Sequence, residues 1–287
     1  MRARKFLTSE FWPQAEKLCY YVLLPALFVH GTANAEPSHL PIGAMAAVLA
    51  GSVVLTATAL VLVQRRIGFN GPAFTSVVQG SIRFNNYLGL SVAVVLYGEH
   101  GVALAAVTNA ILVPVVNVLC TIAFARYGSK PLSITGTLRS LGTNPLILAC
   151  AAGLVLNLSG SGLPAGIQDL VRALGSASLP VGLLCVGAAL KISSLGRNLP
   201  PIAYASAVKF LVLPGIAAAA CVLIGLAGPP AGIIVLFLAL PTASSAYVMA
   251  QALGGDSTLM ASTVTLQTIA GVLYLPCLLF LIASFTG

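Results

Sequence analysis

The chain has 287 residues, of which 58% are hydrophobic and only 7% are charged, and its formal net charge at pH 7 is +8. Together with a mean hydropathy of +1.00, this composition excludes a soluble domain and predicts an all-α polytopic membrane protein. The positive charge would suggest nucleic acid for a soluble chain. In a membrane protein, such basic residues lie in loops beside the lipid bilayer, so we expect the bilayer and no nucleic acid as the partner.

A helical span needs about 20 mostly apolar residues. Nine segments meet this need, and little chain remains for a soluble domain. In chain order they are 18–35, 41–63, 73–97, 101–125, 144–160, 167–190, 200–226, 230–252 and 258–285.

Basic residues gather on alternate connections between these segments. They are Arg2, Arg4, Lys5, Lys17, Arg65, Arg66, Arg126, Lys130, Arg139, Lys191 and Arg197. The opposite connections carry Glu36 and Glu99, with Arg172 as the exception. By the positive-inside rule the amino terminus is predicted to be cytoplasmic, and with nine spans the carboxyl terminus lies outside.

Two spans contain matching polar interruptions. Phe84-Asn85-Asn86-Tyr87 precedes Gly98-Glu99, and Pro241-Thr242-Ala243-Ser244 precedes Gly255-Asp256 at the same spacing. Asparagine competes for backbone hydrogen bonds, and proline removes a backbone donor, so both segments predict broken helices. Matched breaks in two halves of a chain are typical of a transporter whose substrate binds between them.

The only cations expected deep within spans are Arg83 and Lys209, and no carboxylate lies deep enough to neutralise them. Such a cation costs roughly 2.5 to 3.5 kcal/mol on insertion scales, so it usually faces a cavity or a partner. One interpretation is an anionic ligand. The other is that the long side chains of Arg83 and Lys209 reach the membrane surface.

The predicted substrate-binding set combines these cations with the polar groups of the breaks: Arg83, Asn85, Asn86, Lys209, Thr242, Ser244 and Ser245. Half-helix amino termini after Asn86 and Ser245 would direct positive dipole ends at a carboxylate. The serines could instead serve helix packing. Pro25, Pro180 and Pro241 are predicted hinge or break positions. The six cysteines show no metal-like spacing, and we expect no metal and no cofactor.

Two correspondences divide the chain into repeats, because Leu24-Pro25 also matches Leu179-Pro180. The predicted boundaries are 1–128 for a first repeat of four spans, 129–143 for a cytoplasmic linker and 144–287 for a second repeat of five spans. Two five-helix units in succession would be inverted across the membrane. The first repeat has four spans and the second has five, so we expect that the first repeat lacks its opening helix. Either the start of the sequence is placed too late, or a nine-span protein is genuine.

Several ordered motifs resemble the auxin efflux carrier family, whose bacterial members include malonate transporter-like proteins. The motifs are Glu10-Phe11-Trp12-Pro13, Tyr20 to Leu27, Arg83 to Gly89, Leu112 to Asn117, Lys209 before Leu213-Pro214, and Leu240 to Ala243. The resemblance implies ten helices in two inverted repeats, crossing broken helices, a homodimer and a bacterial inner membrane. One departure is Phe84, which stands where the plant members have proline at their first crossover.

These observations predict a secondary carrier of a small organic anion, most simply a carboxylate. An anion leaving a cytoplasm that is negative inside gains about 2.3 kcal/mol per charge per 100 mV, so export needs no coupled ion. A proton- or sodium-coupled importer of a dicarboxylate such as malonate is the alternative. A channel or receptor also stays open. An enzyme is disfavoured, because no nucleophile with a base and no metal pair occurs at helical spacing within the spans.

Overall fold

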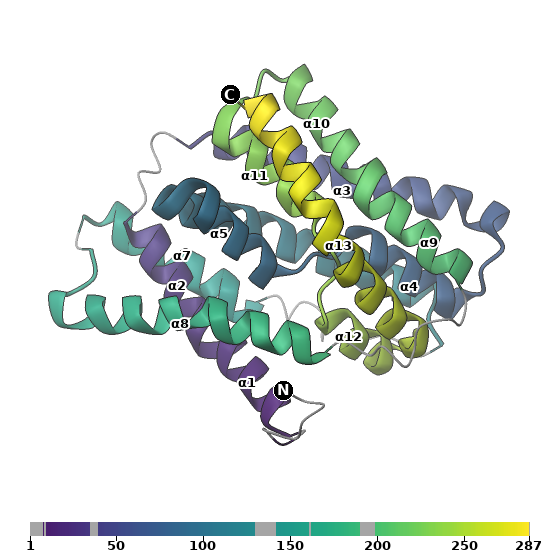
Figure 1. Ribbon diagram of the computed structural model, residues 1–287, viewed down its shortest axis with the longest axis horizontal. Helices are drawn as coiled ribbons and strands as arrows, with labels where there is room; N and C mark the ends of the chain where they lie inside the picture. The colour runs from purple at the N-terminus through teal and green to yellow at the C-terminus, as the bar shows by residue number, and fades with distance from the viewer. Residues whose placement is uncertain are drawn as a thin grey trace. The chain divides into compact units, whose positions relative to one another are not determined.

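The computed structural model describes Thr8 and residues 10–34, 40–129, 142–160, 162–189 and 199–286. Every regular element in these residues is a helix (Figure 1), which confirms the predicted all-α class. The elements are α1 (Phe11–Leu18), a π-helical turn (Cys19–Leu23), α2 (Leu24–Ala33), α3 (Ile42–Ile67), α4 (Gly71–Ile82), α5 (Asn86–Tyr127), α7 (Pro145–Leu158), α8 (Ala165–Ala189), α9 (Leu199–Ala207), a second π-helical turn (Val208–Val212), α10 (Leu213–Leu223), α11 (Gly228–Ala239), α12 (Ser245–Leu253) and α13 (Ser257–Thr286).

The chain is a polytopic membrane protein. Within the described residues, five stretches are long and apolar enough to cross a bilayer: Ile42–Ile67, Gly71–Tyr127, Gly166–Ala188, Leu199–Leu223 and Ser257–Ile282. Two shorter apolar helices, Pro145–Leu158 and Gly228–Ala239, accompany them. The count of nine spans stays a prediction. The predicted linker 129–143 lies almost wholly outside the described residues, as do Arg2, Arg4, Lys5, Glu36, Lys130, Arg139, Lys191 and Arg197.

A glycine divides the longest apolar stretch where the sequence predicts a turn between two spans. Gly98, inside α5, has φ 58° and ψ −136°, a conformation that only glycine adopts without strain. Gly101 then approaches the carbonyl oxygen of Ala93 so closely that a methyl group would collide with it. The second turn of this kind ends α12, where Gly254 has φ 79° just before Gly255-Asp256.

Contacts divide the chain into two compact units. The first comprises Met1–Leu40, Asn86–Ala110 and Leu138–Ala189, and the second Pro41–Asn85, Ile111–Thr137 and Leu190–Gly287. Each unit takes segments from both predicted repeats. A unit defined by contacts differs from a repeat defined by sequence correspondence, and the repeat boundaries stay a prediction.

The first unit is built on close helix packing. In it, α2 contacts both α7 and α8. At Gly153 of α7, an added Cβ would lie 2.8 Å from the carbonyl oxygen of Val29, and at Gly175 of α8 it would lie 2.9 Å from the Cα of Leu27. Small residues allow this close approach of the helix backbones. Because the hydrophobic effect does not drive helices together in a membrane, such close van der Waals packing stabilises their association.

The second unit gathers helices around α4. Here α4 contacts both α9 and α13 (Figure 1), and α13 also contacts α11 and α12. The π-helical turn Val208–Val212 precedes Leu213-Pro214, and Pro214 cannot donate to the carbonyl oxygen of Phe210. The hydroxyl of Tyr274 donates to that oxygen instead. The distorted turn is therefore satisfied from α13, as irregular backbone inside a membrane protein must be.

Candidate functional site

Both interruptions predicted from the sequence are breaks between helices. The first separates α4, which ends at Ile82, from α5, which begins at Asn86, and Arg83 at the break has extended backbone with φ −74° and ψ 156°. The second separates α11, which ends at Ala239, from α12, which begins at Ser245, and Leu240 is extended with φ −67° and ψ 144°. Proline therefore is not required for the first break, where Phe84 and Asn85 interrupt the helix.

The two breaks meet inside the second unit. The hydroxyl oxygen of Thr242 lies 3.1 Å from Gly80 O and 3.5 Å from Arg83 O, so its hydrogen is shared between two carbonyl groups of the first break. The rings of Phe84 and Phe237 also pack edge to face, with centroids 5.9 Å apart. These contacts join residues that are about half the chain apart in sequence.

Arg83 connects the first break to the helix that follows the second. Its guanidinium donates through Nη1 to Oδ1 of Asn117 at 3.0 Å and through Nη2 to Oγ of Ser245 at 3.3 Å. Nη1 also lies 3.2 Å from the sulfur of Met249. The side chain is partly exposed, and its buried Nε has no hydrogen-bond partner among the residues that the structure describes. The guanidinium is thus oriented by neutral partners, and it retains its full positive charge for a ligand.

Lys209 lies on the π-helical turn that contacts α4 and α11, the two helices that lead into the breaks. Its relative exposure is 0%, and its Nζ has no hydrogen-bond partner in the part of the chain that the structure describes. The interpretation that Lys209 extends to the membrane surface is therefore wrong for this structure. A buried amine without an acceptor is unfavourable, so a residue of this kind indicates a functional requirement.

The predicted substrate-binding residues fall into two layers. Asn85, Thr242 and Lys209 are buried. Arg83, Asn86 and Ser244 are partly exposed, and Ser245 is exposed. All of them belong to the second unit except Asn86, which begins the next segment of the first unit. Within the second unit, the exposed layer is therefore a guanidinium with two serine hydroxyls at the amino terminus of α12.

The predicted hinge prolines occupy three different settings. Pro25 lies in the first turn of α2, directly after the π-helical turn Cys19–Leu23. Pro180 lies inside α8, and the helix continues through it. Pro241 lies in the second break and packs near Gly271 of α13, where an added Cβ would be 3.5 Å from the proline Cγ.

Comparison with known proteins identifies the family. A family profile described as "Membrane transport protein" matches residues 131–279, more than half of the chain. The chain belongs to this family, the auxin efflux carriers. It is also 28% identical over 203 residues to a protein of Rhizobium meliloti (strain 1021) named "Putative malonate transporter". That match covers 66% of this chain and 63% of the relative, so the chain spans less than two thirds of the relative's length.

The two breaks also contact buried or partly buried polar residues that were not predicted from the sequence. Gln267 of α13 is fully buried and bonds to both breaks, and Asn117 of α5 holds the guanidinium of Arg83. The available signal was an amide side chain within a predicted span, since polar groups in such spans usually face the protein interior. No group of three or more His, Cys, Asp or Glu in the described segments could hold a metal ion.

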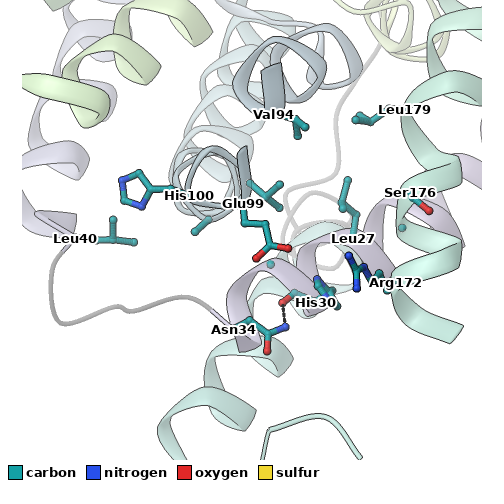
Figure 2. A pocket seen from close by; sticks show the side chains of 14 residues that line it. Leu27, His30, Asn34, Leu40, Val94, Glu99, His100, Arg172, Ser176 and Leu179 are labelled. Atoms are coloured by element: carbon teal, nitrogen blue, oxygen red, sulfur yellow. Dashed lines mark hydrogen bonds between the residues drawn. The ribbon is translucent and has the colours of Figure 1, made fainter. Parts of the chain in front are cut away.

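A cavity of about 560 Å³ lies within the first unit. Its polar lining is His30, Asn34, Glu99, His100, Arg172 and Ser176. Figure 2 shows the Glu99 carboxylate and the Arg172 guanidinium turned toward the same space. This cavity carries charges of both signs, whereas the breaks carry only cations. The breaks are therefore the better site for an anion.

Proposed function

We propose that this transporter is a secondary carrier of a small organic anion, a carboxylate, which binds near the membrane midplane between the two broken helices and crosses by alternating access. Membership of a transporter family supports the carrier class. The name of the Rhizobium relative supports a carboxylate. The single observation that carries the proposal is a partly exposed arginine at the helix breaks, whose hydrogen-bond partners among the described residues include no acidic side chain.

In this proposal Arg83 binds the carboxylate directly. Ser244 and Ser245 add hydroxyl groups at the amino terminus of α12, where the helix dipole also favours negative charge. Asn85, Asn86 and Thr242 orient the ligand or the backbone around it. Lys209 supplies positive potential from the buried layer, and Pro25, Pro180 and Pro241 serve as the positions at which helices bend or end.

The driving force in the proposal is the membrane potential. A potential that is negative inside favours export of an anion by about 2.3 kcal/mol per charge per 100 mV. The direction assumes a bacterial inner membrane with the amino terminus in the cytoplasm, which the basic residues at Lys17, Arg65, Arg66 and Arg126 support. We also propose a homodimer, on the basis of the family resemblance.

Counterflow in proteoliposomes tests the carrier and its substrate class. Vesicles are loaded with unlabelled malonate and diluted into trace radiolabelled malonate, with other mono- and dicarboxylates as competitors. A carrier accumulates label transiently above its equilibrium level, whereas a channel does not. Imposed potential, pH and sodium gradients then separate potential-driven transport from a coupled importer. Absence of saturable flux for every carboxylate tested would overturn the proposal.

Arg83→Gln tests the site within the same assay. Removing a charged hydrogen-bond donor costs about 1.5 to 3 kcal/mol, so we expect the half-saturation constant to rise roughly 10- to 150-fold. The matched control is Arg126→Gln, because Arg126 lies in the same unit and its guanidinium carbon stacks over the ring of Tyr127, 5.6 Å from the ring centroid. Equal effects of the two substitutions would remove Arg83 from the site.

A further inference from the structure

Two fully buried glutamines lie in the second unit, and their hydrogen bonds distinguish them. Gln267 of α13 donates from Nε2 to Gly80 O at 2.9 Å and accepts at Oε1 from the backbone N–H of Thr242 at 3.0 Å. Gln79 of α4 donates from Nε2 to the sulfur of Met260 at 3.8 Å, and its Oε1 has no partner within the described segments. Gln267 therefore joins the two breaks through two hydrogen bonds, whereas the contact of Gln79 with the Met260 sulfur is weaker.

The atoms that Gln267 contacts are those that the breaks leave without helical partners. The carbonyl of Gly80 is in the last turn of α4, and the residue four positions later, Phe84, is no longer helical. The N–H of Thr242 lies in the non-helical stretch between α11 and α12. Both groups are buried where water does not reach, so each needs a partner from the protein.

A primary amide is suited to this task because it carries a donor and an acceptor on one rigid plane. An ionised glutamate would lack the donor for Gly80 O, and leucine would lack both groups. Gln267 thus satisfies an orphan acceptor of one break and an orphan donor of the other at the same time. Its length and geometry set the separation between the two chain segments.

The face of α13 that carries Gln267 contacts both breaks. One turn earlier, the methyl group of Thr263 lies 2.9 Å from the position that a Cβ at Gly80 would take. One turn later, Gly271 lies against Pro241. Residues four apart share one helix face, so Thr263, Gln267 and Gly271 form a continuous strip that contacts the first break and then the second.

We propose that Gln267 is a positioning residue that holds the two breaks in register, so that Arg83 and Ser245 present a preformed anion site. Arg83 follows Gly80 by three residues, and Ser245 follows Thr242 by three. A shift between Gly80 and Thr242 therefore changes the spacing between the guanidinium and the hydroxyl, which is 3.3 Å in the structure. The role in anion binding rests on the proposed function, whereas the connection between the breaks does not.

The experiment compares Gln267→Leu with Gln79→Leu, two substitutions of equal chemistry at equally buried sites of one unit. Hydrogen exchange of peptides covering 240–246 is followed by mass spectrometry in nanodiscs, and saturable uptake of radiolabelled malonate is measured in proteoliposomes. We expect Gln267→Leu to accelerate exchange at Thr242 and to raise the half-saturation constant about 5- to 30-fold, with a smaller effect on the maximal rate. Gln79→Leu should change neither quantity.

Each outcome has a defined meaning. Unchanged exchange in Gln267→Leu would overturn the proposal, as would faster exchange with a half-saturation constant equal to that of Gln79→Leu. A wild-type chain without saturable carboxylate flux, but with the exchange difference intact, would overturn the proposed function and leave Gln267 as the residue that joins the breaks. If Gln267→Leu does not fold, Gln267→Asn provides the same comparison, because it keeps both amide atoms on a side chain shorter by one methylene.

Discussion

Replacing Lys209 by methionine should make the protein more stable and should weaken the proposed anion transport. The side chain of Lys209 is fully buried, and none of the described residues provides a hydrogen-bond partner for its Nζ. Methionine has a similar length, is apolar and is flexible enough to fill the same space. The substitution therefore removes an unsatisfied donor and a buried charge while it preserves most of the packing.

The expected gain in stability follows from the cost of the group that is removed. An unsatisfied buried donor costs about 1 to 3 kcal/mol, and a cation at the centre of a span costs roughly 2.5 to 3.5 kcal/mol on insertion scales. We expect Lys209→Met to stabilise the fold by about 1 to 3 kcal/mol. At roughly 2 to 4 °C per kcal/mol for chains of this size class, the thermal midpoint should rise by several degrees.

The expected loss of function follows from Coulomb's law. For an anion at an assumed separation of about 10 Å and an effective dielectric constant of about 20, one positive charge contributes about 1.7 kcal/mol. Removal of that charge should raise the half-saturation constant for the anion roughly 15-fold. The two effects have opposite signs, which is the pattern expected of a group retained for function at a cost in stability.

The assay measures the thermal midpoint in detergent and carboxylate uptake in proteoliposomes for Lys209→Met and for Gln79→Met. The control replaces a neutral buried side chain in the same unit and should leave uptake unchanged. A destabilised Lys209→Met variant would show that the amine has a partner that stabilises the fold. An unchanged half-saturation constant would show that its charge does not act on the anion.

Three further predictions concern the packing around the breaks and between helices. Thr242→Val should lower the free energy of unfolding by only about 0.5 to 1.5 kcal/mol, because Gln267 still donates to Gly80 O. A decrease in the free energy of unfolding as large as that of Gln267→Leu would contradict this reasoning. Tyr274→Phe should lower the free energy of unfolding by about 1 to 3 kcal/mol, because it leaves the Phe210 carbonyl unsatisfied. The loss should be smaller in a Pro214→Ala background, where the backbone donor is restored, and a double-mutant cycle of thermal midpoints measures the difference. Gly153→Ala should destabilise the first unit by about 1 to 3 kcal/mol, because the added Cβ would collide with α2. The control Gly51→Ala, where the added Cβ would meet open space beside α3, should be neutral or slightly stabilising in the same thermal assay.

In the proposed site, the layered arrangement would give the polar residues distinct roles. Arg83 and Ser245 are accessible to a ligand, while Thr242 and Gln267 are committed to hydrogen bonds between the breaks. Substitutions in the accessible layer should change affinity with little change in stability. Substitutions in the buried layer should change both, and the ratio of the two effects separates binding residues from positioning residues.

The sequence by itself determined the features that depend on local chemistry. The all-α membrane class follows from apolar composition, because a bilayer admits few other structures for such a chain. The two breaks follow from Asn85, Asn86 and Pro241, since these residues weaken or remove helical hydrogen bonds wherever they occur. The turn at Gly98 and the family motifs are likewise readable from short stretches of sequence.

Only the tertiary structure decided which distant groups meet. Gln267 bonds to Thr242, 25 positions away, and to Gly80, 187 positions away, and no local pattern encodes either pairing. The complete burial of Lys209 and the orientation of Arg83 by Asn117 also depend on how separate helices pack. A helix break leaves backbone groups without partners, but the side chain that satisfies them is chosen by the three-dimensional arrangement of the surrounding helices.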